Sequence, residues 1–132
     1  MPLKLSLKPG ETFILNGAVV RNGERRGVLL LENRARILRE KDIMMPEQAE
    51  TPVTRAYFAV MQMYLSGETD GCWYDHAALA LADLIASQPP GQTRDDVLAI
   101  SADIACGDLY KALGGCRSLI RMLEPAAFKE AV

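Results

Sequence analysis

The sequence of 132 residues is poor in aromatic side chains and histidine, and it has no long apolar run. Aromatic residues make up 6% of the chain, and there is one tryptophan and one histidine. No apolar stretch approaches the roughly 20 residues that a membrane-spanning helix needs. The start of the chain alternates apolar and polar residues and lacks the apolar core of a signal peptide. These absences argue against membrane and secreted proteins, and we expect a cytoplasmic location.

Residues that commonly build catalytic or metal sites are also scarce. The histidine, His76, follows Asp75 in a predicted helix, where neighbouring side chains project in different directions and do not form a dyad. No CxxC or HExxH spacing occurs, and no glycine-rich phosphate loop follows a strand. The odd number of cysteines suits reduced, buried thiols rather than a disulfide framework; they are Cys72, Cys106 and Cys116. We therefore expect no enzyme, no metal and no cofactor.

What the chain does contain is typical of a globular protein whose charge is unevenly distributed. Hydrophobic residues make up 49% of the chain and charged residues 24%. Residues 1–41 hold nine bases and four acids, whereas residues 42–132 hold six bases and thirteen acids. The net charge of −2 hides this split. We expect the basic and the acidic part to face different partners.

The basic part predicts short β-strands separated by tight turns. Leu3, Leu5 and Leu7 alternate with polar residues, which is typical of a strand with one apolar face. Asn16-Gly17 is a strong signal for a two-residue hairpin turn. The expected strands are 3–8, 12–15, 18–21, 28–32 and 36–39. They predict a small antiparallel meander or half-barrel whose open apolar face must be covered.

A connector at 46–53 holds Pro46 and Pro52, which limit its conformational freedom, so we expect the basic and the acidic part to dock.

Four helices are expected after the connector. The first spans 54–65 and the second 72–87, the third follows an N-cap at Thr93, and the fourth follows an N-cap at Asp108 and is stopped by Pro125.

Gly114-Gly115 lies inside the last expected helix. The two glycines cost that helix roughly 2 kcal/mol relative to two alanines, which predicts a kink or a point of close packing.

The whole pattern predicts an α+β protein. A basic antiparallel β unit of about five short strands is expected at 1–45 and the connector at 46–53. An acidic bundle of about four helices is expected at 54–132, packed with or linked to the β unit.

Cations of the β unit are the first candidate binding feature. They are Lys4, Lys8, Arg34, Arg36, Arg39 and Lys41. If the first and last strands are neighbours, these side chains form one cationic edge that could bind the phosphates of single-stranded RNA. The alternative is that they decorate the solvent face of a small sheet. Phe13 is the only aromatic residue of the basic part, so base-stacking platforms are not expected and any RNA contact uses backbone edges and cations.

The nearly all-apolar helix at 54–65 is the second candidate feature. It carries Tyr57, Phe58, Met61 and Tyr64. A helix that is apolar on most sides is either buried in the core or lies in an interface with a partner, where flexible methionines suit a docked helix. Both readings remain open from the sequence.

Several strings together resemble the flagellum biosynthesis repressor family FlbT of alphaproteobacteria. They are residues 1–11 (MPLKLSLKPGE), 15–19 (LNGAV), 38–44 (LREKDIM), 56–61 (AYFAVM) and 107–113 (GDLYKAL). The resemblance spans essentially the whole chain. It implies post-transcriptional control of flagellin through the 5′ untranslated region of its mRNA, together with or in opposition to the small flagellar protein FlaF, with repression and activation both open.

The N-terminal part is also similar to the RNA-binding regulator CsrA. The likeness lies in a first strand that runs into a Gly-Glu turn (Gly10-Glu11) and a last strand that ends in Arg39-Glu40. It implies that RNA is held between the first and last strands, near Lys4, Arg36 and Arg39, and further at Lys8 and Lys41.

Two functions follow as expectations. In the first, the basic unit binds the flagellin mRNA leader and alters its translation or decay. In the second, the helices form a chaperone or adaptor for FlaF or flagellin without direct RNA contact, as the acidic half and the apolar helix would suit. Homo-oligomers are compatible with either.

Overall fold

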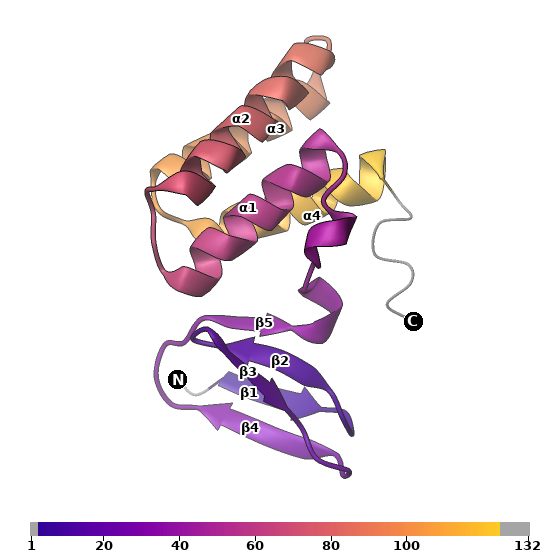
Figure 1. Ribbon diagram of the computed structural model, residues 1–132, viewed down its shortest axis with the longest axis vertical. Coiled ribbons are helices and arrows are strands. Elements are labelled where there is room, and N and C mark those ends of the chain that lie inside the picture. The colour runs from indigo at the N-terminus through magenta and orange to yellow at the C-terminus, as the bar shows by residue number, and fades with distance from the viewer. Residues whose placement is uncertain (1–2, 125–132) are drawn as a thin grey trace. The chain divides into compact units, whose positions relative to one another are not determined.

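The computed structural model describes residues 3–124 and divides the chain into two compact units, which meet in the sequence between Ile43 and Met44 (Figure 1). Five strands lie in the first unit and four α-helices in the second, among the residues described. The predicted α+β fold is therefore confirmed. None of the helices within residues 3–124 combines the length and the apolar character needed to cross a bilayer.

The strands form two antiparallel sheets rather than one. They are β1 (Leu3–Leu7), β2 (Thr12–Leu15), β3 (Ala18–Arg21), β4 (Gly27–Leu31) and β5 (Ile37–Arg39). β1 pairs with β4, while β2 lies between β3 and β5. The arrangement is not a meander, because the chain leaves the first sheet after β1 and returns to it only at β4.

Turn chemistry explains the β2–β3 hairpin. Asn16 and Gly17 adopt φ angles of 50° and 86°, the left-handed pair that a two-residue hairpin turn requires. The predicted hairpin is confirmed. Its register places Phe13 opposite Val20, and Phe13 is 3% exposed. Leu7 and Leu38 are the other buried apolar side chains of the β unit among the residues described.

A short connecting region joins the units in sequence. It contains two 3₁₀ turns, η1 (Glu40–Asp42) and η2 (Pro46–Gln48), and then α1 (Pro52–Ser66). α1 begins earlier than predicted because Thr51 caps it: the Thr54 N–H donates to Thr51 Oγ1 at 3.4 Å. Proline at the first helical position loses no hydrogen bond there.

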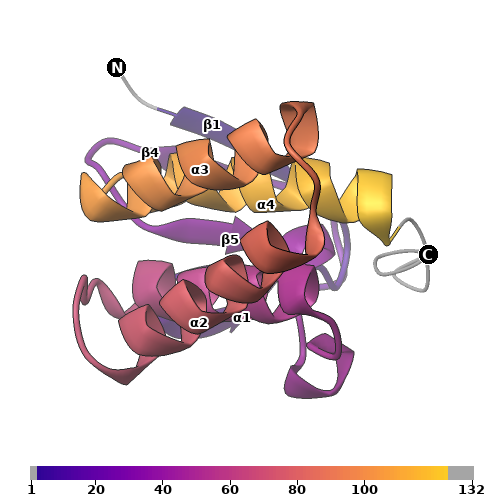
Figure 2. The ribbon, with the colours of Figure 1, turned by 90° about the horizontal axis from the view of Figure 1, so that it is seen from above.

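The helical unit continues with α2 (Cys72–Ser87), α3 (Gln92–Ala105) and α4 (Leu109–Leu123). α1 packs against α2 and α4, and α3 packs against the same two helices, which closes a four-helix bundle (Figure 2). The core is lined by the predicted stripe of α4, whose members Leu109, Ala112, Leu113, Cys116, Leu119 and Ile120 are buried.

The first turns of α3 and α4 show which of the two predicted N-caps is used. Asp108 caps α4, because its Oδ1 accepts the Lys111 N–H at 3.3 Å. The predicted cap at Thr93 is wrong: the Asp95 N–H donates to Gly91 O, so the first turn of α3 closes on Gly91 and Thr93 lies inside the helix. Pro125, predicted to stop α4, lies outside the described residues.

Gly115 marks the close packing that the paired glycines predicted. A Cβ atom at Gly115 would lie 2.7 Å from Ile100 Cγ1 on α3, whereas one at Gly114 would meet nothing closer than Arg117 Nη2 at 3.9 Å. The glycine therefore lets α4 approach α3, since any larger residue would push against a buried branched side chain.

Candidate nucleic-acid interface

The six predicted cations lie at different levels of burial within the β unit. Lys4, Lys8, Arg34 and Lys41 are exposed, whereas Arg36 and Arg39 are half-buried. Lys4 is on β1 and Lys8 in the turn after it, Arg34 and Arg36 lie in the β4–β5 connection, Arg39 ends β5, and Lys41 is in η1. The six come from one unit but from five separate segments of it.

The condition for a single cationic edge, first and last strands paired as neighbours, is not met. β1 is hydrogen-bonded to β4, and β5 is hydrogen-bonded to β2, so the two strands belong to different sheets. They nevertheless meet through one side chain, because Arg39 Nη2 donates to Ser6 O on β1 at 2.6 Å. The cations of β1 and β5 therefore do not follow a common ladder.

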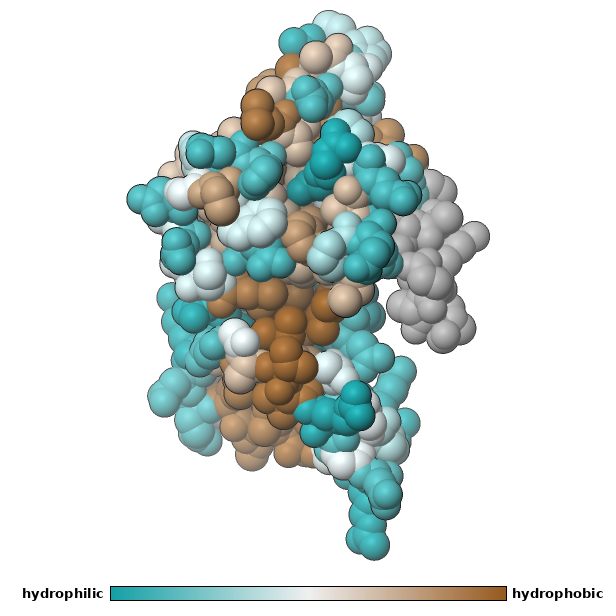
Figure 3. Space-filling view, viewed as in Figure 1, coloured by the Kyte–Doolittle hydropathy of each residue, from teal (hydrophilic) through white to brown (hydrophobic). Residues whose placement is uncertain are grey.

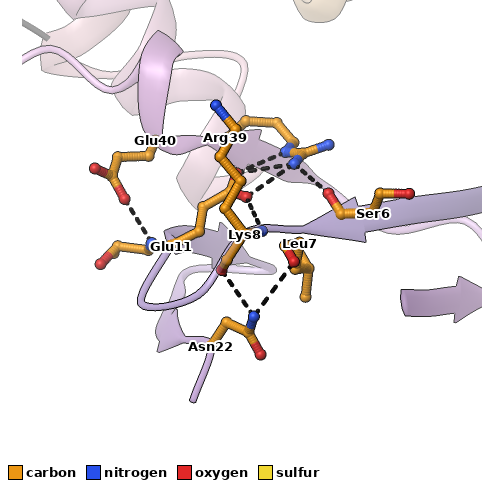
Figure 4. Close-up of polar contacts among 8 residues, drawn as sticks. Ser6, Leu7, Lys8, Glu11, Asn22, Arg39 and Glu40 are labelled. Atoms are coloured by element: carbon orange, nitrogen blue, oxygen red, sulfur yellow. Dashed lines mark hydrogen bonds and ion pairs between the residues drawn. The ribbon is translucent and has the colours of Figure 1, made fainter. Parts of the chain in front are cut away.

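Arg39 is held by a carboxylate of its own unit (Figure 4). Its Nε donates to Glu11 Oε2 at 3.0 Å and its Nη2 to the same oxygen at 2.9 Å. The side chains of Arg39 and Glu11 are 30% and 11% exposed. A guanidinium that already donates to a carboxylate and a carbonyl has few donors left for a phosphate. We therefore assign Arg39 to positioning β1, β5 and the turn between β1 and β2.

Glu11 is the other half of this contact, and its environment favours the ionised form. Burial alone would raise the pKa of Glu11, but the Lys8 N–H, which donates to Oε1 at 2.9 Å, and the adjoining Arg39 hold that pKa below its ordinary value. The carboxylate thus stays charged at neutral pH and neutralises Arg39.

Two further side chains secure the same turn (Figure 4). Asn22 Nδ2 donates to Lys8 O at 2.8 Å and to Arg25 O at 3.0 Å, which joins the β1–β2 turn to the β3–β4 loop. Glu40 Oε1 accepts the Thr12 N–H at 2.6 Å. The turn is therefore built from residues that are distant in sequence, and it presents the Lys8 side chain to solvent from a fixed backbone.

The end of β3 and the β3–β4 loop add exposed cations that the sequence interpretation did not select. Arg21, Arg25 and Arg26 are exposed, and no ion pair holds them among residues 3–124. Gly10 N–H donates to Gly23 O at 2.8 Å, so the loop lies beside the turn that carries Lys8. The signal available in the sequence was the pair Arg25-Arg26 between two glycines.

Arg36 differs from the other cations. Its backbone is fixed by Asn16, whose Oδ1 accepts the Arg36 N–H at 2.9 Å and whose N–H donates to Arg36 O at 2.8 Å. Its Nε is buried and has no hydrogen-bond partner within the described chain.

The four predicted partner-binding residues of α1 divide into two pairs. Tyr57 and Met61 are buried, with 0% and 3% exposed, and Met61 Sδ accepts the Met44 N–H at 3.4 Å. Phe58 and Tyr64 are half-buried and contact the rings of Trp73 at 5.5 Å and Tyr110 at 5.7 Å. Most of this apolar helix therefore serves intramolecular packing.

The cysteines correct one expectation. Cys116 is buried, as predicted, but Cys72 and Cys106 are exposed, because one begins α2 at its first residue and the other follows the end of α3. All three are free thiols. Burial raises the pKa of Cys116 to about 12 against a smaller opposing effect of Arg117, so this thiol stays protonated and unreactive.

Within residues 3–124, no cluster of three His, Cys, Asp or Glu side chains could hold a metal ion.

Comparisons with known proteins connect this architecture to one family. The family model described as "Flagellar protein FlbT" matches residues 3–126. A flagellum biosynthesis repressor protein FlbT of Caulobacter vibrioides is 50% identical over 120 residues, which cover 91% of this chain and 85% of that protein. A probable flagellum biosynthesis repressor protein FlbT of Rhodopseudomonas palustris is 39% identical over 124 residues, covering 94% and 96%.

No solved structure matches the chain significantly. The family match covers both units, from β1 to the end of the helical bundle, and it confirms the resemblance carried by the sequence motifs. The chain belongs to the FlbT family of flagellar proteins.

Proposed function

We propose that this protein regulates flagellum synthesis by binding the 5′ untranslated region of flagellin mRNA in the cytoplasm and altering its translation or decay. Two of its relatives are named a flagellum biosynthesis repressor protein and a probable flagellum biosynthesis repressor protein, which supports the regulatory part. Occupancy of the leader would hide or expose the ribosome-binding site, or change access of nucleases, without catalysis.

The observation that carries the RNA contact is a set of exposed cations without carboxylate partners in a small unit. Lys4 lies near the start of β1 and Lys8 in the turn that follows it, and no ion pair holds either side chain among residues 3–124. Arg34 and Lys41 are exposed in the same unit. Their ammonium and guanidinium groups can each neutralise a phosphate, and single-stranded RNA offers phosphates that follow such an irregular surface.

In this proposal Arg39 does not contact RNA directly but positions the residues that do. Its donors hold Glu11 and Ser6 O, so RNA is expected to touch the cations around it rather than its guanidinium. Loss of Arg39 would still weaken RNA binding, but through displacement of β1 and the Lys8 turn. The CsrA-like placement of RNA between the first and last strands is kept only for Lys4, Lys8, Arg36 and Lys41.

Binding to a labelled flagellin leader at several salt concentrations tests the proposal. The log of the affinity should fall linearly with the log of the salt concentration, with a slope of roughly −0.7 for each phosphate contacted. The double variant Lys4→Ala, Lys8→Ala should weaken binding and flatten this slope. The matched control is Arg121→Ala, which removes an exposed cation of the helical unit. Equal affinity of the double variant and the control would refute this site.

A protein-adaptor role is the second candidate, because the helical unit exposes large apolar side chains. Leu79 on α2 is 66% exposed and Leu98 on α3 is 49% exposed, and these two helices pack against each other. Purified FlaF and flagellin would be tested for binding to the protein and to a Leu79→Ser, Leu98→Ser variant. Binding of either protein that this variant loses, with no retention of leader RNA by the wild type, would favour the adaptor.

A further inference from the structure

The outer edge of β4 is an open strand edge on an apolar strand. Residues 27–31 read GVLLL, and within the described chain their hydrogen bonds are those of the β1 ladder alone. Val28 and Leu30 are 57% and 58% exposed, and Figure 3 shows apolar side chains reaching the surface of the N-terminal unit. An exposed, uncharged edge strand is a template for pairing with another strand.

The charges on either side of β4 are arranged antisymmetrically about Leu29. Glu24 and Arg26 precede the strand, and Glu32 and Arg34 follow it. A two-fold axis through Leu29 places residues whose numbers add to 58 opposite each other. Arg26 then faces Glu32 of a second copy directly beyond the strand ends, while Glu24 and Arg34 lie further out, on either side of the bends at 24–25 and 33. The exposed residues Val28 and Leu30 also face each other across the axis.

Neighbouring registers of the same pairing are less favourable. An axis through Val28 or through Leu30 would separate Arg26 from Glu32 of the second copy. The first would instead bring Glu24 toward Glu32, and the second would bring Arg26 toward Arg34. Like charges directly opposite each other on adjacent strands are destabilising. A shift by one residue would put the exposed face of one copy beside the inward face of the other. The flanking charges therefore favour the register with the axis at Leu29 among the antiparallel pairings.

We propose that two copies of this chain pair antiparallel through β4, with the two-fold axis at Leu29, and form a four-stranded sheet in the order β1–β4–β4–β1. The second copy is favoured over an unrelated strand because the complementary charges are present in this sequence itself. The side chains of Lys4, Val28 and Leu30 share one face of the β1–β4 ladder, so that face would be continuous across the dimer.

Charge reversal tests the pairing with the full-length protein. Sedimentation velocity at low ionic strength, over concentrations up to hundreds of micromolar, gives the dimer dissociation constant. Arg26→Glu should raise this constant roughly tenfold or more, because both symmetry-related contacts become repulsive. Glu32→Arg should do the same, and the double variant Arg26→Glu, Glu32→Arg should restore dimerisation.

The control is Arg25→Glu, which makes the same charge change one residue away, where the facing residue is the neutral Asn33 of the second copy. Circular dichroism checks that each variant keeps its secondary structure. A wild type that stays monomeric at every concentration would overturn the proposal. So would a dimer that Arg26→Glu leaves intact, or a double variant that remains monomeric, since complementary charges would then not be what joins the copies.

Discussion

Replacing Arg39 with alanine should destabilise the N-terminal unit more than removal of an exposed lysine does. The substitution deletes the contacts to Glu11 and the bond to Ser6 O. A hydrogen bond to a charged group contributes about 1.5–3 kcal/mol when it is shielded from water. Because Arg39 is 30% exposed, water replaces part of this interaction, and we expect a loss of about 2 kcal/mol in the free energy of unfolding.

The pH dependence of this loss follows from the lowered pKa of Glu11. A carboxyl group with a depressed pKa in the folded state contributes stability above its unfolded pKa, near 4.5, and this stability is lost as the pH falls through the folded pKa. The difference between wild type and Arg39→Ala should therefore be complete at neutral pH. It should shrink at pH values below about 4.5, where Glu11 becomes protonated.

Urea unfolding combined with hydrogen exchange measures this effect. Exchange of the amides of β1 and of the turn after it should accelerate in Arg39→Ala, while Lys41→Ala, an exposed cation with no ion pair in the described chain, should leave it unchanged. A double-mutant cycle with Glu11→Ala should give a coupling free energy of about 1–2 kcal/mol. A coupling near zero, or a loss that does not diminish in acid, would refute the structural role of Arg39.

Two other substitutions probe the helical unit. Gly115→Ala should lower the free energy of unfolding by about 1–3 kcal/mol, because the new Cβ would press on the buried Ile100. Gly114→Ala should raise the free energy of unfolding by about 0.5–1 kcal/mol through helix propensity alone. Equal urea midpoints of the two variants would contradict the close approach of α4 to α3. A thiol reagent should modify two cysteines in the native protein and Cys116 only after unfolding, and rapid reaction of three thiols in the native state would contradict its burial.

Local features were predictable because their causes are local. The Asn16-Gly17 turn and the Asp108 cap depend on residues within four positions of each other, and both occur as expected. The apolar stripe of α4 was predictable for the same reason, since periodicity alone places it on one face. Thr93 shows the limit: a good capping residue is not used when the preceding glycine closes the first turn.

Long-range pairings were not predictable from the same signals. Alternation identifies β1 as a strand but does not tell whether β2, β4 or β5 lies beside it. Arg39 and Glu11 are separated by 28 positions, and a basic residue in a basic segment gives no sign that a distant carboxylate neutralises it. The sequence was enough to name cations such as Lys4 and Lys8, which the structure shows to be exposed, while the role of Arg39 required the structure.

The proposed dimer and the proposed RNA contact can be joined in one measurement. Lys4 shares the exposed ladder face with Leu30, so pairing through β4 would place the Lys4 side chains of two copies on one continuous surface. Glu32→Arg adds a positive charge to each copy, and electrostatics alone predicts tighter RNA binding. If the dimer is the form that binds, the same variant should bind RNA more weakly at concentrations near the dissociation constant, and Arg26→Glu in addition should restore affinity. Tighter binding by Glu32→Arg would mean that each copy holds RNA independently.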